Sequence, residues 1–188
     1  MAQDSAIDKI PPQNLDAEMA VLGSMLLDDE AIATAVEKPE SRSFYKESHQ
    51  KIFQVICDLY SANKAVDLIT LTDALKREGI IDAVGGASYL TALANSVPSA
   101  ANIGHYVSIV KEKNILRNLI SNGTKIISLC YASEGNIDEV VDNAERLIFE
   151  ISERKAQGSY QHIKDIVSDS IETIDTLYRK KAHVTGIP

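Results

Sequence analysis

The chain has 188 residues, of which 45% are hydrophobic and 24% charged, and its formal net charge is -8 at pH 7. Its length suits one globular domain with an appendage, because a domain of about 150 residues can bury roughly two thirds of its unfolded surface. Residues 1–40 hold nine acidic residues and two lysines, whereas residues 41–188 are nearly neutral. Surfaces that bind a phosphate backbone are basic, so the composition argues against this chain as the main grip on DNA.

The composition also bears on localisation. Residues 1–12 are polar and acidic, whereas an export signal needs a basic and then an apolar segment. No apolar run approaches the roughly 20 residues of a membrane helix. We therefore expect a cytosolic protein that does not bind membranes. Its two cysteines, Cys57 and Cys130, lie among apolar residues, and we expect both to be reduced, small and buried.

Three helices are predicted in the first third of the chain. Asn14 is a typical N-cap, and the apolar spacing after it predicts a helix through about Leu26. A short helical segment follows and ends before Pro39, because proline cannot continue a helix. A third helix is predicted from about Ser48 to Ala62.

Glycines and a proline divide the next segment into short helices. Thr70 followed by Asp73 resembles a capping box and predicts a helix from Leu71. Gly79 ends this helix, because glycine accepts the left-handed backbone of a helix C-terminus. The pair Gly85-Gly86 predicts a tight turn before another short helix, which ends near residues 94–96, before Pro98. These patterns indicate a compact bundle of short helices.

A long helical hairpin is predicted next. An apolar pattern runs from Ile103, after the potential N-cap Asn102, to about Ala132. A polar break follows, in which Asn136 resembles another N-cap, and a return helix should lie antiparallel to the first. The basic residues of the first arm are interpreted as a solvated face; they are Lys111, Lys113, Arg117 and Lys125.

The apolar surface of this hairpin is wider than its own packing needs. A helix with one packed side has an apolar stripe of about 100°, and the first arm exceeds this width. We therefore predict self-association through residues 107–155; the alternative is packing on the return helix and the head alone. The residues predicted to carry self-association are Leu116, Leu119, Ile120, Ile127, Leu147 and Ile151.

A separate amphipathic helix is predicted near the C-terminus. Residues 156–162 lack an apolar period and are interpreted as a connector. An isolated helix of under 20 residues is marginal in water, so the one that follows must dock on another surface or fold back on its own head. Its predicted docking residues are Ile163, Ile166, Val167, Ile171, Ile174, Leu177 and Tyr178.

Five ordered blocks of residues carry a family resemblance. They include Pro11-Pro12 with Asn14 and AVLGS at 20–24, Phe44-Tyr45 with His49, DLITLT at 67–72, Gly85-Gly86 with Tyr89, and PSAAN at 98–102. Together they resemble the N-terminal domain of bacterial replicative DNA helicases, the DnaB-like family, from about Pro11 to Pro188.

The resemblance implies an all-α fold and a division of the chain. The implied parts are a tail (1–12), a helical head (13–106), a hairpin (107–155), a connector (156–162), a linker helix (163–182) and, at 183–188, the start of a RecA-like ATPase domain. It implies that the linker helix docks on a neighbouring subunit's motor domain. A helicase of this family unwinds duplex DNA with ATP and Mg²⁺, so the resemblance implies that these residues are an inactive fragment of such an enzyme.

Partners are implied by the same resemblance. They are further copies of the chain in a hexameric ring, DNA primase, a helicase loader and, mainly through the motor domain, single-stranded DNA at replication forks in the nucleoid. The candidate primase contacts are Tyr89, Ile120 and Ile126.

The residues themselves offer no sign of catalysis. The sequence contains no GxxxxGK[ST] loop for phosphate, and its four histidines lack metal-ligand spacing. We therefore predict no catalytic, cofactor-binding or metal-binding residue in this chain. Two alternatives stay open: a stand-alone adaptor or loader-like protein of the replication machinery, and a DNA-binding helical module, which the net charge disfavours.

Overall fold

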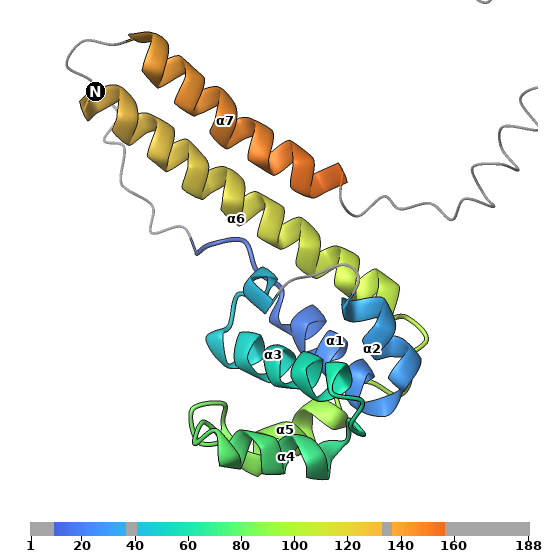
Figure 1. Cartoon of the computed structure of the whole chain (residues 1–188). Helices are drawn as coiled ribbons and strands as arrows, with labels where there is room; N and C mark the ends of the chain where they lie inside the picture. Colours follow the sequence, from blue (N-terminus) through green and yellow to red (C-terminus); the bar gives the residue numbers. More distant parts are fainter. Residues whose placement is uncertain (1–9, 37–40, 133–136, 157–188) are drawn as a thin grey trace, which may run out of the picture. The chain divides into compact units, whose positions relative to one another are not determined.

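The computed structural model describes residues 10–36, 41–132 and 137–156, with side chains through residue 151. Every regular element in these ranges is a helix, which confirms the all-α prediction (Figure 1). Residues 1–9 of the expected tail, the linker helix, the final segment and the Asn136 cap lie outside the described residues. The elements are α1 (Leu15–Leu27), α2 (Asp29–Val36), the short 3₁₀ helix η1 (Ser41–Ser43), α3 (Glu47–Ser61), α4 (Leu68–Arg77), α5 (Gly86–Ala94), α6 (Ile103–Ala132) and α7 (Ile137–Ala156).

Side-chain caps fix the starts of two helices. The Asn14 side chain accepts a hydrogen bond from the Ala17 backbone N–H at 3.0 Å, so the predicted cap of α1 is confirmed. The capping box predicted at Thr70 and Asp73 is wrong. Asp67 is the N-cap of α4, and Thr70 occupies the third helical position of the box. An aspartate carboxylate can accept two backbone N–H groups at once, so the helix begins three residues earlier than expected.

Glycines with positive φ close and open the turns around α4 and α5. Gly79 follows the end of α4 with φ +71°, and Gly85 precedes α5 with φ +102°. Such angles are rare for residues with a Cβ atom, so glycine suits both positions. α5 then ends at Ala94, ahead of Pro98, as its sequence predicts.

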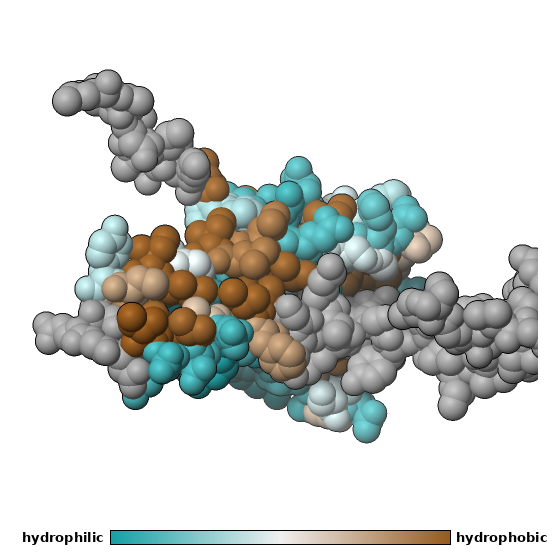
Figure 2. Space-filling view, turned by 90° about the horizontal axis from the view of Figure 1, so that it is seen from above, coloured by the Kyte–Doolittle hydropathy of each residue, from teal (hydrophilic) through white to brown (hydrophobic). Residues whose placement is uncertain are grey.

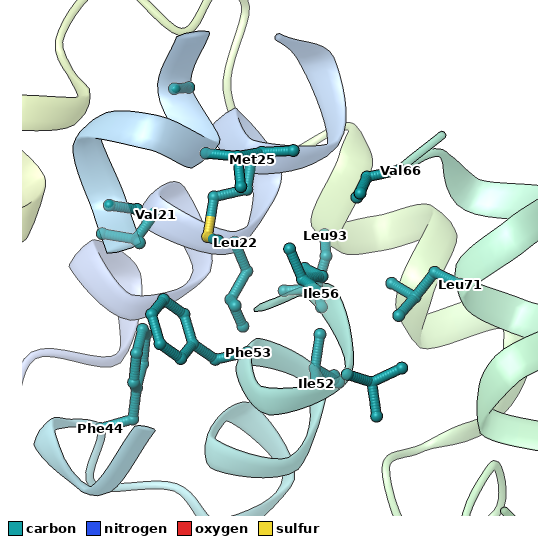
Figure 3. Close-up of a cluster of buried hydrophobic side chains, with 14 of the residues drawn as sticks. Val21, Leu22, Met25, Phe44, Ile52, Phe53, Ile56, Val66, Leu71 and Leu93 are labelled. Carbon is teal, nitrogen blue, oxygen red and sulfur yellow. The ribbon is translucent and has the colours of Figure 1, made fainter. Parts of the chain in front are cut away.

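The core of the head is built around α1, which packs against α2, α3, α5 and α6. Figure 3 shows Leu22 and Met25 of α1 close to Phe53 and Ile56 of α3. The rings of Phe44 and Phe53 lie 4.9 Å apart between centroids, a separation typical of favourable aromatic pairs. This mostly apolar cluster joins helices from residue 17 to residue 110.

A glycine allows α1 and α5 to approach closely. Gly23 lies inside α1, and a Cβ atom there would overlap the carbonyl oxygen of Leu93 and the hydroxyl of Ser96. The Ser96 hydroxyl also donates a hydrogen bond to the backbone oxygen of Met19 at 3.1 Å. The AVLGS block therefore contains a packing requirement that only glycine meets without movement of the neighbouring chain.

α6 and α7 form the predicted hairpin, and Figure 1 shows them side by side with opposite chain directions. The Asn122 side chain of α6 donates a hydrogen bond to the backbone oxygen of Leu147 in α7 at 2.8 Å. Asn122 is buried in the seam between the arms. The expectation for the two cysteines is only partly correct, because Cys57 is half-buried in α3 while Cys130 is exposed near the end of α6.

Candidate functional site

The carboxylate of Glu18 holds the N-terminus of α3 against α1. Glu18 is only 2% exposed. It accepts hydrogen bonds from the backbone N–H groups of Tyr45 at 2.6 Å and Lys46 at 3.3 Å. Lys46, the N-cap residue of α3, makes no capping hydrogen bond with its own side chain. Glu18 therefore acts as a tertiary cap, and the partial positive charge of the helix N-terminus stabilises its negative charge.

A buried histidine extends this network to α5. The Nδ1 atom of His49, which is fully buried, lies 2.7 Å from Glu18. Because an ionised carboxylate only accepts hydrogen bonds, Nδ1 donates. Nε2 shares a hydrogen bond with the Tyr89 hydroxyl at 2.6 Å, and the Lys46 ammonium donates to that hydroxyl at 2.9 Å. The rings of His49 and Tyr89 are stacked, with an interplanar angle of 8°. Tyr89 is thus held by two residues at the start of α3, and Glu18 of α1 holds one of them, His49.

Arg117 connects the base of the hairpin to the same region. Its guanidinium donates hydrogen bonds to the backbone oxygens of Pro12 and Ser43 and lies 5.8 Å from the centroid of the Tyr45 ring. Burial lowers the pKa of Arg117, and the negative charge of Glu18 acts against that shift. The interpretation of Arg117 as part of a solvated basic face is therefore wrong. Its role is to tie α6 to the head.

Beyond Arg117, the hairpin exposes large apolar side chains on both of its arms. Ile120 and Ile127 of α6 are 57% and 59% exposed, and Ile148 of α7 is 56% exposed. Figure 2, which views the molecule from the hairpin end, shows apolar residues gathered in a broad area bordered by polar ones. Large contiguous apolar areas on a protein surface mark places where other molecules bind. We use the name hairpin surface for six of these exposed side chains: Leu116, Leu119, Ile120, Ile127, Val141 and Ile148.

The residues predicted to carry self-association are not equally accessible. Leu116, Leu119, Ile120 and Ile127 are exposed, whereas Leu147 is half-buried and Ile151 is buried within the single chain. Of the candidate primase contacts, Ile120 is exposed, Ile126 is half-buried, and the hydroxyl of Tyr89 is occupied by the internal network. The predicted docking residues of the linker helix, from Ile163 to Tyr178, lie outside the described residues.

In the part of the chain that the structure describes, no group of three or more His, Cys, Asp and Glu side chains could hold a metal ion. Within the same ranges, no helix is long and apolar enough to span a bilayer.

Comparison with known proteins decides the family. The model of the DnaB-like helicase N-terminal domain matches residues 10–112, more than half of the chain. The chain belongs to this family. It is 42% identical over 181 residues to the replicative DNA helicase DnaC of Bacillus subtilis and 41% identical over 181 residues to DnaB of Geobacillus stearothermophilus. Each match covers 96% of this chain and 40% of the relative, so the chain spans about two fifths of the length of these helicases.

Solved structures agree with the DnaB-like fold. The crystal structure of the N-terminal domain of DnaB helicase from Mycobacterium tuberculosis matches with a TM-score of 0.72 and 43% identity, covering 75% of this chain and 99% of that domain. A structure described as a DnaB-like replicative helicase and its interactions with primase matches with a TM-score of 0.64 and 28% identity, covering 93% of this chain and 39% of that helicase.

The polar network of this DnaB-like domain was not foreseen from its sequence. Glu18 and His49 are 31 positions apart, and no short motif pairs them. The available signal was a glutamate followed at once by apolar residues of α1, because an acidic residue inside an apolar run is exposed, paired or capping another element.

Proposed function

We propose that this chain is the N-terminal assembly and docking region of a replicative DNA helicase. Its DnaB-like fold and its similarity to helicases that are more than twice as long support this proposal. The longer protein would unwind duplex DNA by ATP hydrolysis with Mg²⁺. That activity requires a phosphate-binding loop, which these 188 residues do not contain. The region described here is then inactive by itself and contributes assembly.

The hairpin surface carries this proposal. The side chains of Ile120, Ile127 and Ile148 on the two arms are each more than half exposed to water. A second copy of the chain could bury them, and burial of apolar surface favours association. Each large aliphatic side chain contributes about 1.5–3 kcal/mol when it is fully removed from water. The function of the hairpin is therefore to pair subunits, as the collar of a hexameric ring in the longer protein.

Docking of primase is the second part of the proposal. A relative of known structure is described together with its interactions with primase. Tyr89, Ile120 and Ile126 remain the candidate contacts on this chain. Ile120 and Ile126 belong to the hairpin, whereas the contacts of Tyr89 with His49 and Lys46 favour a supporting role for its hydroxyl.

The remaining roles belong to the longer helicase. We propose that residues 163–182 dock on a neighbouring motor domain. We also propose the division of the chain that the resemblance implies, in which one part ends at each of residues 12, 106, 155, 162 and 182. The loader and single-stranded DNA are partners of the longer protein, which would act in the cytoplasm at replication forks. The similarity to replicative helicases supports each of these roles.

The proposal is tested by placing charge on the hairpin surface. Ile120→Asp and Ile127→Asp in one chain put two carboxylates where a second copy would bury apolar surface. Sedimentation equilibrium should show a loss of self-association, with an unchanged helical circular dichroism spectrum. Ile69→Asp is the matched control, because Ile69 is 80% exposed on α4, outside the hairpin. Undiminished association of the double variant would refute the hairpin as the interface.

Primase docking is tested separately with Ile126→Asp. The variant chain would be mixed with the C-terminal domain of primase, and binding would be measured by calorimetry. We expect binding to weaken at least tenfold. If primase binds normally to an intact oligomer of this variant, Ile126 is not part of the docking site.

A further inference from the structure

A glycine lies in the middle of the exposed apolar stripe of α6. Leu116, Ile120, Gly123 and Ile127 are spaced by four, three and four residues, so they share one face of the helix. The three large residues are exposed, and Gly123 is half-buried. Glycine weakens a helix interior because it has the greatest conformational freedom in the unfolded chain. A glycine at the centre of an apolar stripe therefore costs helix stability, which a role in packing would explain.

Nothing within the chain itself requires glycine at this position. A Cβ atom on Gly123 would meet no atom within 4 Å, and the residue does not have a positive φ. Gly23 is the contrasting case, since a Cβ there would overlap the chain around Leu93. The space above Gly123 is thus available for a molecule that approaches the backbone of α6 closely.

The charges on the hairpin favour α6 of a second copy as that molecule. Between Ile115 and Ala132, the charged residues of α6 are Arg117, which is tied to the head, and Lys125. By contrast, residues 137–151 of α7 include five acidic residues and one arginine. Two α7 helices facing each other would bring like charges together, which is unfavourable. Two α6 helices avoid that repulsion.

The polar residues beside the stripe suit the same partner. The hydroxyls of Thr124 and Ser128 donate hydrogen bonds to the backbone oxygens of Ile120 and Thr124 at 2.9 and 3.0 Å. Because these donors are already satisfied inside α6, they can be covered by another helix without the cost of an unpaired buried donor.

We propose that the α6 helices of two copies cross at Gly123, so that each glycine lies against the other close to the two-fold axis of a symmetric dimer. The distance between packed helices depends on the side chains at their crossing, and in a two-fold dimer a residue near the axis meets its own counterpart. This inference rests on the proposed self-association, and it names the residue that sets the closest approach of the two subunits.

Alanine substitution separates this role from helix stability. Gly123→Ala removes a weak helix residue, so the single chain keeps or gains stability, while the added methyl group separates the crossing helices. We expect its dimer dissociation constant from sedimentation equilibrium to rise at least tenfold. Gly104→Ala is the matched control, since Gly104 also lies in α6 with an open Cβ position but outside the stripe. Association of Gly123→Ala as tight as that of the control would overturn the crossing point.

A cross-linking experiment provides an independent readout. Gly123→Cys, in a chain where Cys57 and Cys130 are serine, should form an interchain disulfide under mild oxidation, because the two Cα atoms would lie within the roughly 7 Å that a disulfide spans. Gly104→Cys in the same background should stay unlinked. If Gly123→Cys fails to link while the Ile120→Asp and Ile127→Asp chain has lost association, the hairpin is the interface and the crossing at Gly123 is refuted. If that double variant still associates, the self-association proposal itself fails.

Discussion

Replacing Glu18 with alanine would remove the acceptor that joins α1 to the start of α3. Three donors use this carboxylate: the backbone N–H groups of Tyr45 and Lys46, and Nδ1 of His49. Glu18 and His49 are both buried, so water cannot readily replace the lost acceptor. The substitution leaves donors unpaired and a cavity where the side chain was.

The expected loss is a large part of a domain's stability. A buried donor without a partner costs about 1–3 kcal/mol, and the cavity left by the missing side chain adds to this cost. Because Glu18→Ala leaves three donors without their acceptor, we expect it to lower the free energy of unfolding by about 3–5 kcal/mol. Tyr89→Phe should lower it less, by about 1–2 kcal/mol, because only Nε2 of buried His49 loses its partner while Lys46 can turn to water.

Urea unfolding followed by circular dichroism at 222 nm tests this ranking. With a urea slope of about 1–3 kcal/mol per molar, Glu18→Ala should unfold at a midpoint lower by about 1 M or more. Glu47→Ala is the control, because Glu47 is in the first turn of the same helix but exposed, where it pairs with Lys51 at 2.7 Å. Its midpoint should not change measurably. A Glu18→Ala midpoint equal to that of this control would refute the tertiary cap.

Three further predictions concern single side chains. Gly23→Ala should lower the free energy of unfolding by about 1–3 kcal/mol in urea titrations, because the methyl group overlaps the backbone at Leu93; unchanged stability would refute this close approach. Asp67→Ala should lose about 1 kcal/mol at pH 7. Capping hydrogen bonds hold the pKa of Asp67 below its ordinary value of 3.8. The stabilisation that depends on its charge is therefore complete above pH 3.8 and declines as the pH falls further. In acid titrations, the difference in unfolding free energy between variant and wild type should narrow below that pH. Thiol labelling followed by mass spectrometry should modify the exposed Cys130 well before Cys57, because burial raises the pKa of Cys57 to about 11 and the thiolate is the reactive form; the reverse order would contradict the packing of α3.

The helices themselves could be predicted because their signals are local. Asn14 caps α1 through a residue three positions away, and Gly79 and Pro98 interrupt helices by their own backbone geometry. The long apolar period from Ile103 to Ala132 gave the bounds of α6 and the hairpin with it. Each of these features depends on a few neighbouring residues, which the sequence displays directly.

The contacts that tie the head to the hairpin could not be predicted in this way. Arg117 lies in a run of lysines and looked solvated, yet its partner Pro12 is 105 positions away. The Glu18 and His49 pair likewise depends on how α1 and α3 pack. The N-cap of α4 was predicted at the wrong residue, because Asp67 and Thr70 both have a side-chain oxygen that can cap a helix. Only the backbone conformation shows that Asp67 is the N-cap. Local patterns do not report which distant groups meet.

The hairpin surface is the central claim about function, and the mass of the chain in solution tests it most directly. Sedimentation equilibrium of the unmodified chain should give a mass that rises with concentration from 20.5 kDa, the mass of one chain, to at least twice that value at tens of micromolar. A single species of 20.5 kDa throughout this range would contradict self-association through the hairpin.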